Sequence, residues 1–326
     1  METFPNEMLH KYFKWLKKIY KYNLRHARLS FNLFVGLVLV VSMFANSLTS
    51  KKPKSLPSEA LAKEGQSSTS KFTFPSPTPD ILPRPKDLPL PAVSATHIMI
   101  LDRDSKSVIY QKSADLSVPP ASTTKMMTAL VVLDNFSLDQ KITVTKTYPD
   151  GQTIGFQPGE ELSIEQLLYA LLVQSGNDAA EILAENYPGG RVAFVAAMNQ
   201  KAADLLLTHT HFQNPTGLDE DDHYSSASDL ARLADVALNK PEFAKVVSTE
   251  NAVIAGSRVL TNLNQLLGKV PGVLGVKTGF TDNAGQALVT YVNQGHPVVI
   301  VVLKSTDRFA DTESLITWVY SNFTWP

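Results

Sequence analysis

The sequence predicts an α/β domain of the α+β kind, built around one antiparallel sheet. Two strand-like runs open this domain and three close it, while the stretch between them has apolar residues at helical spacing. The 326-residue chain is 44% hydrophobic, which is enough for a large core. Strands at the two ends of a domain can share one core only by pairing with each other. We therefore expect a five-stranded sheet flanked by helices, with a helical insertion between the N- and C-terminal strands.

The elements follow in order along the chain. Short apolar runs at 97–101 and 107–110 flank the turn-rich segment 102–105, which predicts a hairpin. Apolar residues then recur every three or four positions, which predicts helices at 123–134, 164–173, 178–185, 192–207 and 227–238. The closing strands are expected at 273–278, 287–292 and 298–303, with the turn 293–295 joining the last two and a final helix at about 310–323.

Upstream of the domain the chain carries a membrane-type segment. Residues 29–48 form an apolar run without a single charge, and about 20 such residues can span a bilayer. Residues 1–28 hold 7 basic and 2 acidic residues, a bias that keeps an N-terminus in the cytoplasm. We expect a single-pass anchor in the cytoplasmic membrane, with the rest of the chain outside the cytoplasm. A cleaved signal peptide, with Ala45-Asn46-Ser47 as the cleavage site, is the alternative.

The segment 49–93 differs from both of its neighbours in composition. It is rich in Ser, Lys and Pro, and proline at this density favours extended polyproline conformations. The segment is therefore expected to be a semi-stiff spacer between the anchor and a domain at 94–326.

The net charge of -1 hides an uneven distribution. Residues 94–326 hold 16 basic and 25 acidic residues, whereas the first 93 residues are basic overall. The balance of the whole chain argues against a nucleic-acid binder. The absence of cysteine excludes disulfides, thiolate nucleophiles and Cys-ligated metals.

The first candidate for chemistry is the pair Ser122 and Lys125, at the start of a predicted helix. Residues at i and i+3 share a helix face, so the lysine amine can reach the serine hydroxyl. A serine needs a base to become a nucleophile, and a lysine can serve if burial or a nearby cation lowers its pKa. The same spacing occurs at Ser68 and Lys71 in the spacer, so the pair alone proves nothing.

Two further motifs lie downstream. In Ser175-Gly176-Asn177, between two predicted helices, Asn177 either caps the next helix or, with Ser175, takes part in proton relay and substrate positioning. In Lys277-Thr278-Gly279, on a predicted edge strand, the lysine and the hydroxyl can bind a carboxylate, and the glycine lets a substrate backbone approach closely. An ordinary transition from strand to turn is the alternative for this second motif.

Together and in this order, the three motifs match the Ser-x-x-Lys, Ser-x-Asn and Lys-Thr-Gly set of β-lactamases and penicillin-binding proteins. More narrowly, the chain resembles the low-molecular-mass D-alanyl-D-alanine carboxypeptidases, a serine peptidase family with a β-lactamase/transpeptidase-like fold. The resemblance covers nearly all of 94–326 and includes the stretches 175–180, 198–199, 214–218, 223–227 and 277–281.

The resemblance implies a role for each motif residue. Ser122 would attack the penultimate D-alanine carbonyl of a peptidoglycan stem peptide, with Lys125 as its base. Ser175 would pass a proton to the leaving amine, and Asn177 would hold Lys125 and a substrate amide. The terminal carboxylate would bind Lys277 with Thr278, beside Gly279, and Arg308 sits where the family often has a carboxylate-binding arginine. The backbone N–H groups of Ser122 and Phe280 would form the oxyanion hole.

Lys125, Lys277 and Arg308 would then form a local positive site in an acidic domain, as an anionic peptide terminus requires. No metal or organic cofactor is expected, and β-lactams are expected as covalent inhibitors.

Other classes fit less well. A class A β-lactamase needs a Glu-x-x-Leu-Asn segment, which is absent after Asn177. His209-Thr210-His211 lacks the further ligands of a metal site, and there is no Gly-x-Ser-x-Gly elbow. A D,D-endopeptidase of peptidoglycan cross-links and a non-turnover module that senses β-lactams or wall peptides stay open.

Overall fold

The structure is a computed structural model, and it describes residues 82–326. The predicted basic segment 1–28, the predicted membrane segment 29–48 and most of the predicted spacer 49–93 lie outside the described residues. Within 82–326, no helix combines the length and the apolar character that crossing a membrane requires.

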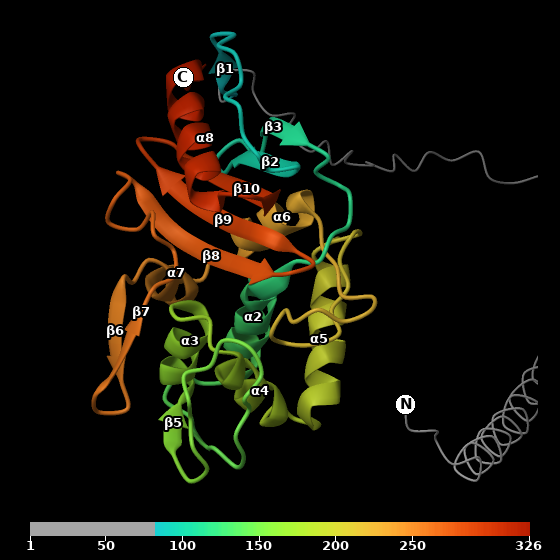
Figure 1. Cartoon of the computed structure of the whole chain (residues 1–326), viewed down its shortest axis with the longest axis vertical. Coiled ribbons are helices and arrows are strands. Elements are labelled where there is room, and N and C mark those ends of the chain that lie inside the picture. Colours follow the sequence, from blue (N-terminus) through green and yellow to red (C-terminus); the bar gives the residue numbers. More distant parts are fainter. Residues whose placement is uncertain (1–81) are drawn as a thin grey trace, which may run out of the picture. The chain divides into compact units, whose positions relative to one another are not determined.

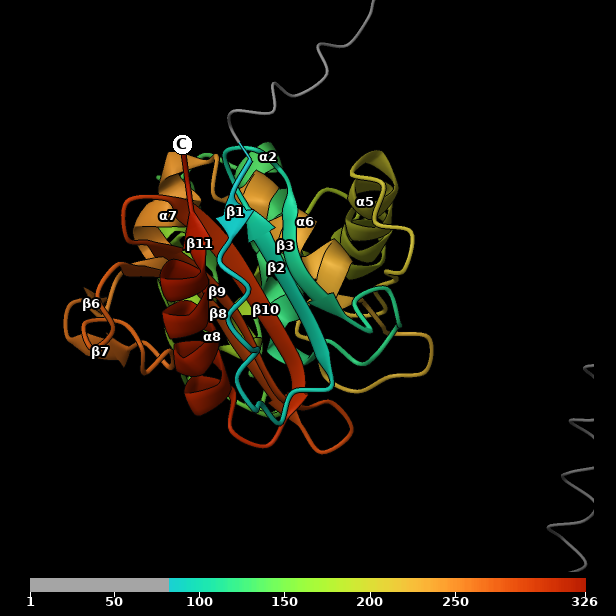
Figure 2. The ribbon, with the colours of Figure 1, turned by 90° about the horizontal axis from the view of Figure 1, so that it is seen from above.

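A five-stranded antiparallel sheet forms the centre of the domain, in the spatial order β3-β2-β10-β9-β8 (Figure 2). Its strands are β2 (His97–Asp102), β3 (Val108–Lys112), β8 (Val273–Thr281), β9 (Gly285–Asn293) and β10 (Pro297–Ser305). The predicted sheet of N- and C-terminal strands is therefore confirmed. Strand β8 continues three residues beyond its predicted end and forms an edge of the sheet.

Alternating side chains of β10 contact two separate cores. Val298, Ile300 and Val302 belong to the core under helix α8 (Arg308–Asn322). Val299, Val301 and Leu303 belong to the larger core on the helical side. This period of two is expected for a strand covered on both faces. The sheet thus lies between α8 on one face and the inserted helices on the other (Figure 2).

The insertion contains a 3₁₀ turn, six α-helices and two small hairpins. Its helical elements are η2 (Ala121–Thr124), α2 (Lys125–Asn135), α3 (Ile164–Leu172), α4 (Asn177–Glu185), α5 (Gly190–Asp204), α6 (Ala227–Ala237) and α7 (Pro241–Val247). All five predicted helices in this region are present, although the first begins with the 3₁₀ turn. A capping box between Ser163 and Gln166 sets the start of α3.

Three short strand pairs and α7 were not predicted from the sequence. The pairs are β4 (Lys141–Thr143) with β5 (Glu161–Ser163), β6 (Asn251–Ile254) with β7 (Arg258–Thr261), and β1 (Arg84–Pro85) with β11 (Phe323–Thr324). Figure 1 shows the β6–β7 hairpin projecting from the body of the domain. Strands of two to four residues carry too little alternation for a pattern to show.

The residues just before the sheet are tied to the end of α8. The backbone N–H of Lys86 donates to the Asn322 carbonyl at 2.7 Å, and that of Leu88 donates to Asn322 Oδ1 at 2.8 Å. Further along, the Asp311 carboxylate accepts hydrogen bonds from Ser94 and Ala95. The last part of the predicted spacer therefore packs on the face of the domain that α8 covers.

Candidate active site

Ser122 lies on a tight turn that contacts the edge strand β8. The residue before it, Ala121, has φ +49°, a left-handed conformation that is costly for a residue with a Cβ. Two glycines allow other segments to approach this turn. A Cβ added to Gly279 of β8 would lie 3.2 Å from the Ser122 backbone nitrogen, and one added to Gly217 would lie 1.9 Å from the Ala121 carbonyl oxygen. Close backbone packing from two sides therefore fixes the turn.

The Lys125 amine lies one helical turn from the serine and is fully buried. It donates to Ser122 Oγ at 2.9 Å, to Asn177 Oδ1 at 2.7 Å and to the Thr216 carbonyl at 2.6 Å. These are the three hydrogen bonds that an ammonium can donate. When the amine is neutral, its lone pair can instead accept the hydroxyl proton of Ser122 along the same contact.

The surroundings of Lys125 favour the neutral amine. Burial lowers the pKa of Lys125 well below its ordinary value, and the charge of Lys277 lowers it further. The carboxylates of Asp178 and Glu181 oppose this effect and raise the pKa. Burial, aided by the charge of Arg308, also lowers the pKa of Lys277, to about 7. As the sequence-based hypothesis of a lysine base requires, burial and a nearby cation both lower the pKa of Lys125 in the structure.

Asn177 contacts the candidate base and does not cap its helix. Gly176 is the N-cap residue of α4, and no side chain caps the helix there. The Asn177 side chain instead accepts from Lys125 and donates through Nδ2 to the Asp150 carbonyl at 2.9 Å. Of the two interpretations of Asn177, the structure therefore supports the one that places it beside Lys125.

Ser175 lies buried in the turn between α3 and α4, with φ +63°. Among the hydrogen bonds of residues 82–326, none joins its hydroxyl to Lys125 or to Lys277. Its relay role stays a prediction.

The third motif lies on β8, alongside the Ser122 turn. Lys277 and Thr278 are buried, and the Lys277 amine donates to the Thr278 carbonyl at 3.1 Å. Phe280 is 58% exposed at the same end of the strand. Arg308, at the start of α8, donates from Nη1 to the Gly279 carbonyl at 2.8 Å. The structure thus brings both predicted carboxylate-binding cations to one stretch of β8.

Two residues that support the site were not singled out from the sequence. The first is Thr216, whose carbonyl binds Lys125 and whose loop is shaped by three hydrogen bonds to Asn214 Oδ1. The second is buried Asp178, which accepts backbone N–H donations from Ile154, Gly155, Phe156 and Ala179. Asp178 directly follows the Ser175-Gly176-Asn177 motif, and both Asp178 and Thr216 lie in stretches that carry the family resemblance, 175–180 and 214–218, which are the signals that could have found them.

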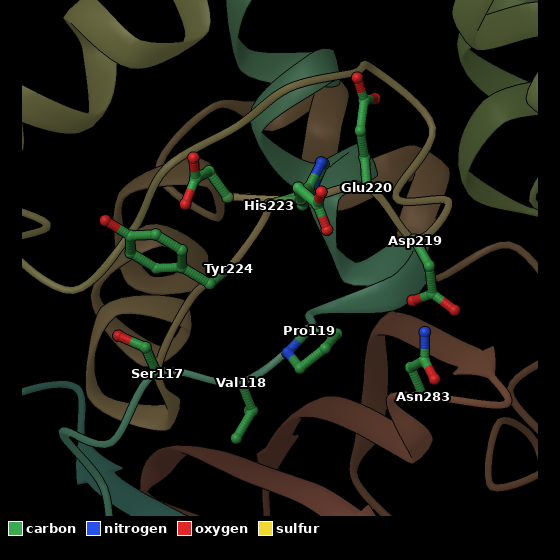
Figure 3. Close-up of a pocket in the computed structure, with 10 residues that line it drawn as sticks. Ser117, Val118, Pro119, Asp219, Glu220, His223, Tyr224 and Asn283 are labelled. Atoms are coloured by element: carbon green, nitrogen blue, oxygen red, sulfur yellow. The ribbon is translucent and has the colours of Figure 1, made fainter. Parts of the chain in front are cut away.

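An acidic hollow of about 480 Å³ lies close to the Ser122 turn. In Figure 3 the loop residues Asp219 to Tyr224 lie on one side of it, with Ser117 to Pro119 and Asn283 on the other. The Thr281 hydroxyl at the end of β8 donates to Asp219 Oδ1 at 2.8 Å. The end of β8 is therefore hydrogen-bonded to the acidic loop that lines this hollow.

The fold and the site define a class of protein. A buried lysine of lowered pKa contacts a serine hydroxyl on a strained turn. One cation, Lys277, stands on the adjacent edge strand, and a second, Arg308, contacts that strand from the start of α8. This arrangement fits an acyl-transfer enzyme with a serine nucleophile, a lysine base and an anionic substrate.

Comparisons with known proteins agree with that class. A family model described as D-alanyl-D-alanine carboxypeptidase matches residues 85–307. The chain therefore belongs to the D-alanyl-D-alanine carboxypeptidase family of peptidases. The resemblance identified from the motifs is confirmed.

Individual relatives show how far the similarity extends. The D-alanyl-D-alanine carboxypeptidase DacF of Bacillus subtilis is 33% identical over 247 residues, which cover 71% of this chain and 64% of that protein. A D-alanyl-D-alanine endopeptidase of Pseudomonas aeruginosa is 36% identical over 236 residues, which cover 68% and 76%. The crystal structure of the Streptomyces K15 DD-transpeptidase is similar, with a TM-score of 0.68 and 32% identity over 72% of this chain and all (100%) of that chain.

Proposed function

We propose that this chain is a serine-type D-alanyl-D-alanine carboxypeptidase that removes the terminal D-alanine from peptidoglycan stem peptides. The observation that carries the proposal is the 2.9 Å contact between the buried Lys125 amine and Ser122 Oγ. Membership of the carboxypeptidase family supports the substrate class.

The reaction begins with neutral Lys125. Its amine takes the Ser122 hydroxyl proton while Oγ attacks the carbonyl carbon of the penultimate D-alanine. The backbone N–H groups of Ser122 and Phe280 stabilise the oxyanion. The peptide bond then breaks, the terminal D-alanine leaves after its amine takes a proton relayed through Ser175, and an ester remains on Ser122. Water hydrolyses this ester, which restores the serine.

The terminal carboxylate of the substrate binds Lys277 on β8 and Arg308 at the start of α8. Lys277, Thr278 and Arg308 lie around Gly279, and a glycine at this position leaves room for a peptide beside the strand. β-Lactams acylate the same serine, since they present a carboxylate next to a reactive amide.

The proposal is tested by incubating the full chain with a peptide that ends in D-Ala-D-Ala and measuring free D-alanine. Wild type releases D-alanine continuously, and the Ser122→Ala variant releases none. A single burst without turnover identifies a sensing module and overturns the proposal.

Cleavage of cross-links is the second candidate, because some relatives of comparable identity are named D-alanyl-D-alanine endopeptidases. The same site serves both reactions, since both break a bond after a D-alanine. Digestion of purified wall material, with products identified by mass spectrometry, separates them: loss of D-alanine alone supports the carboxypeptidase, and conversion of dimers to monomers supports the endopeptidase.

We propose further that residues 29–48 hold the chain in the cytoplasmic membrane and that 49–93 place the domain outside the cytoplasm. The charge pattern of residues 1–48 supports this location. Cell fractionation with N-terminal sequencing tests it: an intact N-terminus in the membrane fraction supports the anchor, and a chain that begins after Ser47 indicates a cleaved signal.

A further inference from the structure

A cavity of about 240 Å³ lies beside the candidate base. Asn177 and Thr216 line it, and these residues supply two of the three oxygen acceptors of the Lys125 amine. The ion pair between Glu181 and Arg191 lines the same cavity. A charged pair with no place in the proposed reaction therefore adjoins the group on which that reaction depends.

Helix α4 brings Glu181 to this position. Asn177 and Glu181 are four residues apart in the helix, so their side chains lie on one face in adjacent turns. Glu181 Oε2 accepts from Arg191 Nε at 2.9 Å, and the Glu181 side chain is only 17% exposed. Water therefore screens the charge of Glu181 poorly, and Arg191 is its salt-bridge partner.

Among residues 82–326, three charged groups act on Lys125: Lys277 from β8, and Asp178 and Glu181 from α4. Burial and Lys277 lower the pKa of Lys125, whereas both carboxylates raise it. Asp178 is held by four backbone N–H groups. Glu181 differs because its salt-bridge partner is a side chain, which a substitution can remove.

We propose that Arg191 is a positioning residue for acylation, because its pairing with Glu181 shields Lys125 from a negative charge and keeps the amine able to accept the Ser122 proton. The inference rests on the proposed function, in which Lys125 is the base. An unpaired Glu181 favours the ammonium form, and an ammonium cannot accept a proton.

The test is the pH dependence of the rate at which a fluorescent penicillin acylates the full chain. This rate falls on the acidic side as Lys125 becomes protonated. Arg191→Gln moves the acidic limb to higher pH, and Glu181→Gln moves it to lower pH. A limb shift of about half a pH unit changes the rate at a fixed pH on the limb about threefold. The double variant, which combines Arg191→Gln with Glu181→Gln, has its acidic limb at the same pH as Glu181→Gln alone.

The two single variants are expected to move the acidic limb in opposite directions, and this difference distinguishes an electrostatic role of the ion pair from a structural one. A salt bridge that only held the cavity in shape affects the plateau rate, and both single variants change it in the same direction. The inference is overturned if the acidic limbs of Arg191→Gln and Glu181→Gln shift in the same direction. It is also overturned if the plateau acylation rate falls while the limb stays in place.

Glu185→Gln is the matched control. Glu185 lines the same cavity one turn further along α4, and it pairs with Lys146 at 2.8 Å. Glu185 is not among the charges that act on Lys125, so the acidic limb of Glu185→Gln stays at the wild-type position. A shift equal to that of Glu181→Gln contradicts the proposed geometry. If wild type itself is not acylated, the proposed function fails, and this outcome differs from an unchanged limb in an active enzyme.

Discussion

Replacement of Gly217 by alanine tests whether close backbone packing holds Ser122 in place. The added Cβ would lie 1.9 Å from the Ala121 carbonyl oxygen and 2.4 Å from its carbon, so one of the two backbones must move. Forcing extra atoms into a packed site costs about 1–3 kcal/mol. Gly217 also has φ +87°, where a residue with a Cβ costs about 1–2 kcal/mol. The expected loss of unfolding free energy is therefore about 3 kcal/mol.

The substitution also affects the candidate site, because the neighbouring Thr216 carbonyl binds Lys125. A loop that moves away from Ala121 takes this acceptor with it. We expect acylation by a fluorescent penicillin to slow about tenfold, which corresponds to about 1.4 kcal/mol at the barrier.

Gly155→Ala provides the control, since Gly155 has φ +86° and, apart from its two chain neighbours, no residue of 82–326 has a heavy atom within 4 Å of an added Cβ. It carries the conformational cost without the clash. Urea unfolding and acylation rates are measured for both variants. Equal losses of stability in the two, with equal acylation rates, refute the steric explanation.

Three further predictions concern titration and the support of the sheet. The pKa of Lys277 is about 7, so kcat/KM for a peptide with a free terminal carboxylate falls as pH rises above 7; an equal fall for the terminal amide contradicts this. Burial lowers the pKa of His223 to about 4, so the stability from its neutral ring is complete above pH 6.5 and is lost as pH falls toward 4. Urea unfolding at pH 7 and pH 5 should differ by about 2 kcal/mol, and by less in His223→Gln. Asp311→Asn weakens hydrogen bonds to Ser94, Ala95 and Ser305, so unfolding shows a loss of about 1–3 kcal/mol while acylation stays at the wild-type rate; slower acylation contradicts a purely structural role.

The His223 prediction follows from its hydrogen bonds as well as its burial. Its Nδ1 faces the Gln213 backbone N–H at 3.3 Å and so accepts, which leaves the proton on Nε2 to donate to Thr124 Oγ1 at 2.9 Å. Protonation at Nδ1 removes the acceptor of the Gln213 backbone N–H. The neutral ring thereby links the start of the Lys125 helix to the loop that carries Thr216.

The individual strands of the sheet and the Ser122–Lys125 pair could be predicted because each depends on residues that are close together in the sequence. Strand β10 is almost wholly apolar, and a spacing of three places two side chains on one helix face whatever surrounds them. The role of Arg308 was implied by the family resemblance, and the structure places its guanidinium 2.8 Å from the Gly279 carbonyl.

Other parts of the site could not be predicted, because they depend on contacts between distant segments. The third acceptor of Lys125 is a backbone carbonyl, at Thr216, and every residue type has one. For Asn177, capping and contact with Lys125 were equally compatible with the sequence, and the choice depends on where loop 150–156 lies. In the short hairpin β6–β7, Ile254 and Leu260 are buried while Val253 and Val259 are exposed, so both faces carry apolar residues and the sequence lacks the apolar–polar alternation of a predictable strand.

The most direct test of Ser122 as the nucleophile is to locate the adduct. The full chain is labelled with a penicillin and digested, and the acylated residue is identified by mass spectrometry. We expect one adduct, on Ser122, which is absent from Ser122→Ala and strongly reduced in Lys125→Ala. An adduct on Ser68 or Ser175, or undiminished labelling of Ser122→Ala, contradicts this expectation.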